Sequence, residues 1–131
     1  MSYGRSAQEW DQLVDAGQAF LIERARLRKV TSYTELNAVI TRRTGLRSFD
    51  FTHAEERAAI GHLLGRIVEQ TYPSTGLMLS ALVHYLDAND AGPGFYQLAA
   101  HLGLLPPVAS ARAKEEFWIR QVTAVHNHYA S

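Results

Sequence analysis

Apolar side chains recur at the spacing of an α-helix through most of the chain, and this periodicity limits the fold more than any other feature. The first periodic stretch predicts a helix from Ala7 to Arg28, in which Gly17 is a weak point and a candidate bend. Its expected apolar face consists of Trp10, Leu13, Val14, Phe20, Leu21 and Leu27. The pattern breaks at 30–32, so a second element is expected to begin there.

Two further helices are indicated by the spacing of a capping box, a Ser or Thr three residues before a Glu. Ser32 with Glu35 predicts a helix that ends near Thr44 and Gly45, because Gly is a common helix terminator. Thr52 with Glu55 predicts a third helix to about Gln70, followed by a turn over residues 71–76. The loop 45–52 between these helices is expected to turn Phe49 and Phe51 inward.

The C-terminal half begins with Leu77–Leu86, a short apolar run between turn signals, which suits a buried strand. A buried helical segment is the alternative. The strand needs a partner, for which the candidates are Lys29–Thr31 and the residues near Phe95. A tight turn is expected over 87–94, then a short helix Phe95–Leu102 and a last helix Ser110–Tyr129.

These elements indicate a mainly α (α+β) protein, a compact helical domain with a short β element. The length of 131 residues suits a single domain over 1–131. The chain has no cysteine, which excludes disulfides, thiolate zinc sites and a Cys nucleophile. The N-terminus lacks the apolar core of a signal peptide, and Leu77–Leu86 is too short to span a bilayer. A cytoplasmic protein with no membrane partner is therefore expected.

The charge is distributed unevenly, although the chain as a whole is neutral. Residues 24–47 hold seven Lys and Arg residues against one acidic residue, a net charge of +6 between acidic flanks. Such a block attracts phosphate or an acidic protein surface. Together with the start of the second helix it supplies the candidate nucleic-acid contacts: Arg24, Arg28, Lys29, Thr31, Ser32, Tyr33, Arg42, Arg43 and Arg47. The alternative is a helix cap with Tyr33 in the core and solvated arginines around it.

The segment Val30-Thr31-Ser32-Tyr33-Thr34-Glu35-Leu36 resembles the entry into the winged-helix DNA-binding domain of the alkylguanine-DNA alkyltransferases and alkyltransferase-like proteins. Ala59-Ile60-Gly61 is similar to the start of the family's recognition helix. Leu82-Val83, with Gly94-Phe95 after a turn, resembles its strand and glycine-rich wing. The resemblance implies that Tyr33 and Thr31 contact the DNA backbone near a flipped base.

The chain also departs from that family at two important positions. The Pro-Cys-His-Arg motif is absent, since the corresponding stretch reads Leu79-Ser80-Ala81-Leu82, so alkyl transfer to a cysteine is excluded. The arginine that replaces the extruded base would fall at Ala58, with Arg57 next to it. The resemblance therefore implies a non-catalytic binding module of winged-helix type.

Other residue patterns give weaker indications of chemistry. His126 and His128 would diverge on a helix and could share a metal only on an extended tail, so neither a metal site nor a cofactor is predicted. A lone His84 or His62 among apolar residues is more typical of a core or boundary residue. A small enzyme that uses His84, His126 or the pair Asp87/Asp90 is the least favoured hypothesis.

The main alternative to nucleic-acid binding is a protein-interaction module without enzymatic activity, such as an inhibitor, an immunity protein or a complex subunit. It is motivated by the lack of a catalytic constellation and by large aromatic residues that could anchor an interface. These candidates are Trp10, Tyr72, Tyr85, Tyr96, Trp118 and Tyr129. Under this hypothesis the partner is another protein or a second copy of the chain.

Overall fold

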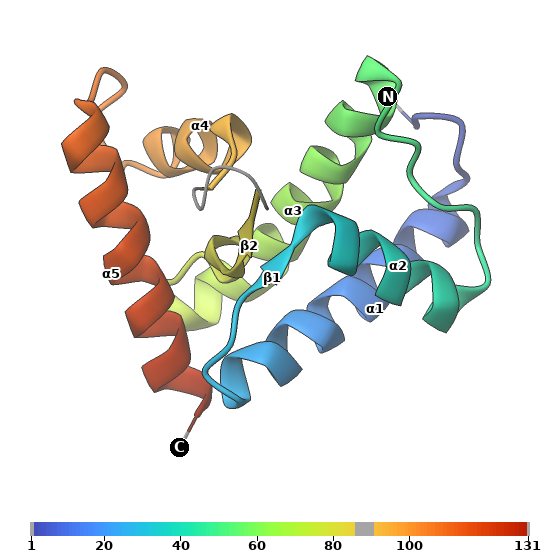
Figure 1. Ribbon diagram of the computed structural model, residues 1–131, viewed down its shortest axis with the longest axis horizontal. Coiled ribbons are helices and arrows are strands. Elements are labelled where there is room, and N and C mark those ends of the chain that lie inside the picture. Colours follow the sequence, from blue (N-terminus) through green and yellow to red (C-terminus); the bar gives the residue numbers. More distant parts are fainter. Residues whose placement is uncertain (1, 86–90, 131) are drawn as a thin grey trace.

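The computed structural model describes residues 2–85 and 91–130, and in this part the chain forms five α-helices and one two-stranded parallel sheet (Figure 1). The elements are α1 (Ala7–Arg26), β1 (Thr31–Ser32), α2 (Tyr33–Thr44), α3 (Ala54–Thr75), the 3-10 helix η1 (Leu79–Leu82), β2 (Val83–His84), α4 (Pro93–His101) and α5 (Ala111–Tyr129). The mainly α class predicted from the sequence is confirmed. None of these helices combines the length and the apolar character needed to cross a bilayer.

Helix α1 begins with a complete capping box formed by Ser6 and Glu9. The Ser6 hydroxyl accepts from the Glu9 N–H at 3.1 Å, and the Glu9 carboxylate accepts from the Ser6 N–H at 2.8 Å. The helix packs against α2 and α3. Gly17 is buried where α1 meets α3, and a Cβ there would lie 3.0 Å from Cδ1 of Ile67. Its role is thus close helix packing rather than a flexible point.

Helix α2 has the predicted bounds, with Ser32 as N-cap and Gly45 in the left-handed conformation at its end (φ 72°). The Ser32 hydroxyl accepts from the Glu35 N–H at 3.0 Å. The return bond of the capping box is absent, because the Glu35 carboxylate instead accepts from Arg24 and from the Thr31 hydroxyl. The predicted box is therefore half formed.

The predicted bounds of α3 are wrong at both ends. Thr52 is not the cap, since its hydroxyl and N–H both donate to Asp50, and His53 occupies the N-cap position. The helix continues to Thr75 through the predicted turn at 71–76, with Pro73 inside its last turn. The Thr75 hydroxyl donates to the carbonyl of Thr71 at 2.9 Å, which stabilises this last turn before Gly76 ends it.

The predicted strand Leu77–Leu86 is mostly not a strand. Its centre forms η1, close to the helical alternative, and only Val83–His84 is extended, with Leu86 outside the described residues. This pair bonds in parallel to β1, with Thr31 opposite Val83 and Ser32 opposite His84. Of the two predicted partners, the 29–31 link is right at Thr31, and the region near Phe95 is wrong because it is helical.

The C-terminal helices pack around a second apolar cluster, which includes Phe95, Phe117 and Trp118. Trp118 donates from Nε1 to the carbonyl of Ala81 at 2.8 Å, which ties α5 to η1. The first half of the predicted turn at 87–94, residues 87–90, lies outside the described residues. Its end is seen as Gly92, the N-cap of α4, with Pro93 at the first helical position. Partly buried Val122 packs against both apolar clusters. The assignment of residues 1–131 to a single domain stays a prediction.

The packing at Gly17 predicts that Gly17→Val destabilises the protein by about 1–3 kcal/mol, the usual range for overpacking a core. The added methyl groups would have to displace Ile67 on α3. Gly61→Val is the matched control, because a Cβ at Gly61 meets nothing within 4 Å. Urea unfolding of the two variants should separate them clearly, and equal stability would contradict the close approach.

Candidate functional site

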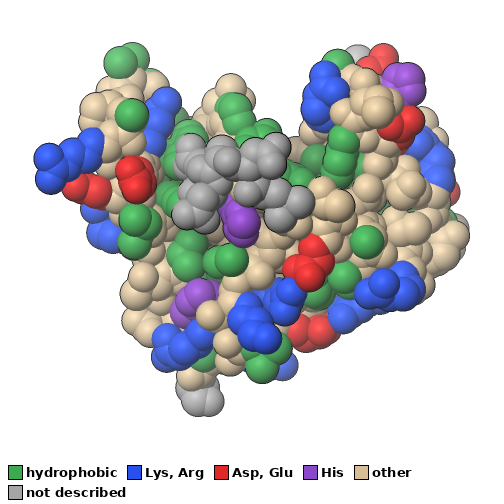
Figure 2. All heavy atoms as spheres, in the orientation of Figure 1, with side chains coloured by type: hydrophobic (Ala, Val, Ile, Leu, Met, Phe, Trp, Pro, Cys, Tyr) green, Lys and Arg blue, Asp and Glu red, His purple; other side chains and the backbone are tan. Residues whose placement is uncertain are grey.

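A cavity of about 910 Å³ opens between the first turn of α2, the N-terminal half of α3, the η1–β2 segment and the start of α4. The surface is visibly hollowed between α4 and α3 (Figure 2). The volume falls within the range of small-molecule sites, roughly 300–1,000 Å³. Four aromatic side chains line the walls: Tyr33, Phe51, Tyr85 and Phe95.

Tyr33 and Tyr85 form one wall, because the β1–β2 pairing brings the residues that follow each strand together. Their ring centroids are 4.9 Å apart and their planes are inclined by 33°. The N–H of Gly92 donates to the Tyr33 hydroxyl, and a Cβ at Gly92 would lie only 2.7 Å from that oxygen. Burial, with a smaller contribution from Tyr85, raises the pKa of Tyr33 to about 12. Tyr33 is thus a neutral, firmly positioned side chain.

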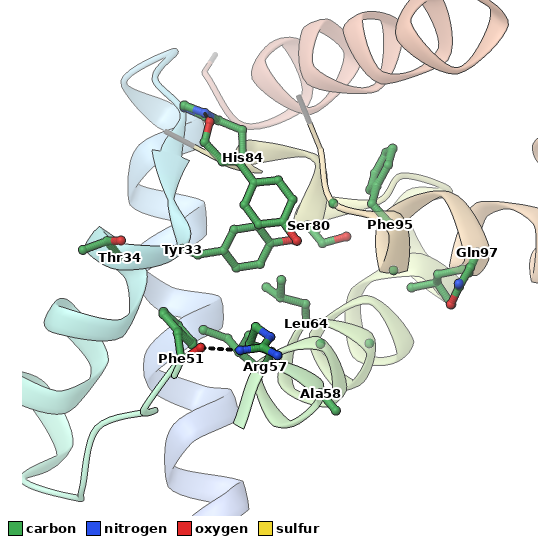
Figure 3. Close-up of a pocket in the computed structure, with 17 residues that line it drawn as sticks. Tyr33, Thr34, Phe51, Arg57, Ala58, Leu64, Ser80, His84, Phe95 and Gln97 are labelled. Carbon is green, nitrogen blue, oxygen red and sulfur yellow. Dashed lines mark hydrogen bonds between the residues drawn. The ribbon is translucent and has the colours of Figure 1, made fainter. Parts of the chain in front are cut away.

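Ser80 lies on η1 and contributes a polar group to the cavity. Ser80 is only 4% exposed, and its hydroxyl has no hydrogen-bond partner among the described residues. In the close-up view it lies between Tyr33 and Phe95 (Figure 3). A buried hydroxyl without a partner is unusual in a folded protein.

Helix α3 presents a face of small residues to the cavity: Ala58, Gly61 and Gly65. Their spacing of three and four residues places them on one side of the helix. Arg57 lines the same cavity and donates from Nη1 to the carbonyl of Phe51 at 2.6 Å (Figure 3). A flat ligand could therefore approach the α3 backbone closely, with a cation at the edge of the cavity.

The start of α3 is held in place by Glu56, whose carboxylate is largely buried. It accepts from Arg5 at 2.9 and 3.1 Å and from Arg47 at 2.9 Å, and the side chain of Arg5 is only 1% exposed. The guanidinium of Arg5 also lies 4.1 Å from the ring centroid of Phe49. The hydrogen bond from Arg5 holds the pKa of Glu56 below its ordinary value of 4.5. This network fixes the loop that carries Phe51.

The predicted basic block does not form one free cationic surface. Arg24 is paired with Glu35 at 2.6 Å, Arg43 with Glu23 at 2.8 Å, and Arg47 with Glu56 at 2.9 Å. On the face shown in Figure 2, Lys and Arg side chains lie in several separate groups with acidic side chains among them. Three of the seven cations in residues 24–47 are therefore paired with carboxylates, and one of these carboxylates, Glu35, belongs to the block itself.

The remaining predicted contacts are distributed in three ways. Arg28 donates to Asn127 at 3.0 Å, while exposed Lys29 and Arg42 form no ion pair with any acidic residue in the described part of the chain. Thr31 and Ser32 are buried, and their hydroxyls bond to Glu35 as described above. Among the nine predicted residues, Tyr33 is the one found in the cavity lining.

The histidines do not form a metal or catalytic cluster within the described residues. His84 lines the cavity, with Nδ1 2.8 Å from the carbonyl oxygen of Tyr85. His126 is engaged elsewhere, with Nε2 3.0 Å from the carbonyl oxygen of Lys29. No group of three or more potential metal ligands occurs in the described ranges, and Asp87 and Asp90 lie outside them.

The aromatic residues proposed as interface anchors divide into buried and exposed members. Trp10 and Trp118 belong to the core, with 4% and 9% exposure. Tyr72, Tyr96 and Tyr129 are partly buried against the apolar clusters. Tyr85 is 46% exposed and lines the cavity, so it is the candidate anchor most available to a ligand.

Comparison of the chain with protein-family models, curated proteins and solved structures finds no match. The resemblance to the alkyltransferase winged helix therefore stays a prediction.

Sequence reasoning missed most of the cavity, including Phe51, Ser80 and Gly65 as lining residues. One available signal was the pair Gly61 and Gly65 inside a strongly helical pattern. Gly in the middle of a helix costs about 1 kcal/mol relative to Ala, so two of them one turn apart indicate a close approach or a site. Nothing local in the sequence indicates that Ser80 faces the same cavity.

Glu56→Gln is expected to lower the free energy of unfolding by about 3–5 kcal/mol, because it leaves the buried Arg5 without a full counter-charge. Glu116→Gln is the control, since its pair with Arg112 is exposed and such pairs contribute about 0–1 kcal/mol. Because the folded-state pKa of Glu56 is lowered, its contribution is present above pH 4.5 and is lost as the pH falls further. Denaturant titrations at neutral and acidic pH should show that Glu56→Gln loses less stability on acidification than the parent protein does. Identical pH profiles would contradict this role of Glu56.

Tyr33 is expected to make the protein sensitive to alkali. Its folded-state pKa of about 12 exceeds the ordinary value of 10, so stability is retained below pH 10 and is lost as the pH rises towards 12. Tyr33→Phe removes this ionisation, so its stability should fall less steeply over that interval. Unfolding curves measured across this pH range test the expectation, and parallel losses in both proteins would show that Tyr33 is not the group responsible.

Proposed function

We propose that this chain is a non-catalytic nucleic-acid-binding module of winged-helix type that takes an unstacked base into the cavity beside Tyr33. The observation that carries the proposal is an open, aromatic-lined cavity at the first turn of α2. Proteins that hold an extruded base enclose it between aromatic or apolar side chains and read its polar edge. The aromatic walls and the small-residue face of α3 supply such an environment.

The resemblance noted in the sequence supports the same location for the base. It implies that Tyr33 lies near a flipped base, whereas the position of the family's base-replacing arginine is occupied by Ala58 in this chain, with Arg57 next to it. Tyr33 lines the cavity, and so do Ala58 and its neighbour Arg57 on α3. Arg57 is exposed at the edge of the cavity, where a cation could enter the space left in a duplex.

Phosphate contacts are assigned to groups near the cavity rather than to the whole 24–47 block. Thr34 is exposed and lines the cavity in the first turn of α2, where backbone N–H groups favour anions. Arg57 adds a positive charge at the edge of the cavity. Because Arg57 is the one Lys or Arg among the described lining residues, the binding is expected to depend only moderately on salt, with a slope that reflects a small number of phosphates.

The proposal excludes nucleophilic chemistry by Ser80. A serine nucleophile needs a base within hydrogen-bonding reach, and the Ser80 hydroxyl has no partner among the described residues. His84, which lines the same cavity, has Nδ1 directed to the Tyr85 carbonyl. The site is therefore suited to binding.

A protein-interaction module is the second candidate function, and the exposed segment between α1 and β1 is the observation that favours it. Leu27 is 62% exposed and Val30 is 36% exposed, and between them lie Arg28 and Lys29. Exposed apolar residues among cations suit a partner surface that is both acidic and apolar better than a phosphate backbone. Leu27→Ser should disrupt such an interface without changing nucleic-acid binding.

Gly61→Leu tests the nucleic-acid proposal, because it fills the cavity at a position where a Cβ meets nothing within 4 Å. The variant should be at least as stable as the parent, since Leu has a higher helix propensity than Gly. Its affinity for a short DNA duplex with a central mismatch should fall about tenfold or more. Thr123→Leu, an exposed change on α5, is the control.

The measurement is fluorescence anisotropy of the labelled duplex over a series of salt concentrations. Binding that weakens with salt and is lost in Gly61→Leu but not in Thr123→Leu supports the proposal. Undetectable binding at low salt, or equal binding by both variants, would reject it.

A further inference from the structure

The hydroxyl of Ser80 is a polar group for which the protein itself supplies no partner. The residue is 4% exposed, and the hydroxyl oxygen has no hydrogen bond to any described residue. The neighbouring side chains on η1 are apolar and buried: Leu79, Ala81 and Leu82. Burial of an unpaired hydroxyl opposes folding, so its presence among these residues calls for a compensating role.

The local structure does not depend on this hydroxyl. The backbone of the segment is held by Gln121, which accepts from the Met78 N–H at 3.0 Å, and by Trp118, which donates to the Ala81 carbonyl at 2.8 Å. The carbonyl of Ser80 accepts from the N–H of Val83. Because η1 is anchored by these bonds, the segment does not rely on the hydroxyl, whose oxygen is covered in the free protein at the cavity that Ser80 lines.

We propose that Ser80 determines which ligand the cavity accepts, by a hydrogen bond to the polar edge of a planar heteroaromatic ring. This inference rests on the proposed function, in which that ring is an unstacked base. A hydroxyl both donates and accepts, so it pairs with a carbonyl oxygen, an amino group or a ring nitrogen. It does not serve a purely apolar ring, which would leave the hydroxyl unpaired.

The surroundings of Ser80 define how the ring would be held. Tyr33 and Phe95 lie on either side of it in the cavity, and the small face of α3 lies across from them (Figure 3). These groups contact the faces and edges of a ring, and the Tyr33 hydroxyl, which accepts from Gly92, keeps its own O–H for a second hydrogen bond. Ser80 supplies a deeply placed polar contact, and Thr34, Arg57, His84 and Gln97 are further polar residues of the lining.

Ser80→Ala separates this role from a structural one. The change removes only the hydroxyl, so the melting temperature of the free protein should rise or stay level. Affinity for a duplex with a central mismatched base should fall roughly fivefold to tenfold, the effect of one lost hydrogen bond. Affinity for the same duplex with an abasic site at that position should not change, because no base then reaches the hydroxyl.

Thr71→Val is the matched control for loss of a buried hydroxyl. Thr71 is 6% exposed, and its hydroxyl donates to the Ile67 carbonyl at 3.0 Å, away from the cavity. This variant should bind both duplexes as the parent does.

The outcomes distinguish this inference from the proposed function on which it rests. If the parent protein binds neither duplex, the proposed function fails and the inference fails with it. If the parent binds but Ser80→Ala affects the mismatched and abasic duplexes equally, or lowers the melting temperature without a base-dependent loss, the inference alone is overturned. A base-dependent loss of affinity with unreduced thermal stability supports it.

Discussion

The parallel pairing of Thr31–Ser32 with Val83–His84 is the constraint on which the site depends. A ladder this short is not stable alone and requires helices packed around it. Thr31 and Val83 are buried, and the residues after each strand are Tyr33 and Tyr85. The pairing therefore brings the first turn of α2 next to η1 and sets the two tyrosine rings against each other. The cavity exists because two segments whose paired residues are 52 positions apart in the sequence are joined at this point.

The charge distribution shows where a linear sequence is informative and where it is not. The count over residues 24–47 is correct, but the count does not identify the carboxylates that lie close in space. Arg43 pairs with Glu23 from α1, and Arg47 pairs with Glu56 from α3. Arg5, from outside the block, forms the most buried ion pair of the described residues. Pairing across helices thus decides which cations remain available to phosphate, and local composition could not predict it.

Local structure was predicted best where side chains near in sequence determine it. Ser32, Gly45 and Ser110 cap helices as their residue types indicate. The run Leu77–Leu86 was misassigned because η1 is buried on all sides, so its apolar residues show neither helical nor strand periodicity. The turn predicted at Pro73 is also wrong, because α3 continues through this residue to Thr75. The hydroxyls of Ser74 and Thr75 donate to the Thr71 carbonyl in this last turn.

Several features that oppose stability occur together around the cavity. Gly61 and Gly65 lie within a helix where Ala would be more stable, and a Cβ would meet no obstacle at either position. Ser80 buries a hydroxyl that has no partner among the described residues. Folding alone does not account for Gly61, Gly65 or Ser80, because larger or less polar residues would pack at these positions as well or better. Local departures from the most stable choice are typical of functional sites, so their concentration at one cavity supports the proposal that places binding here rather than at the basic block.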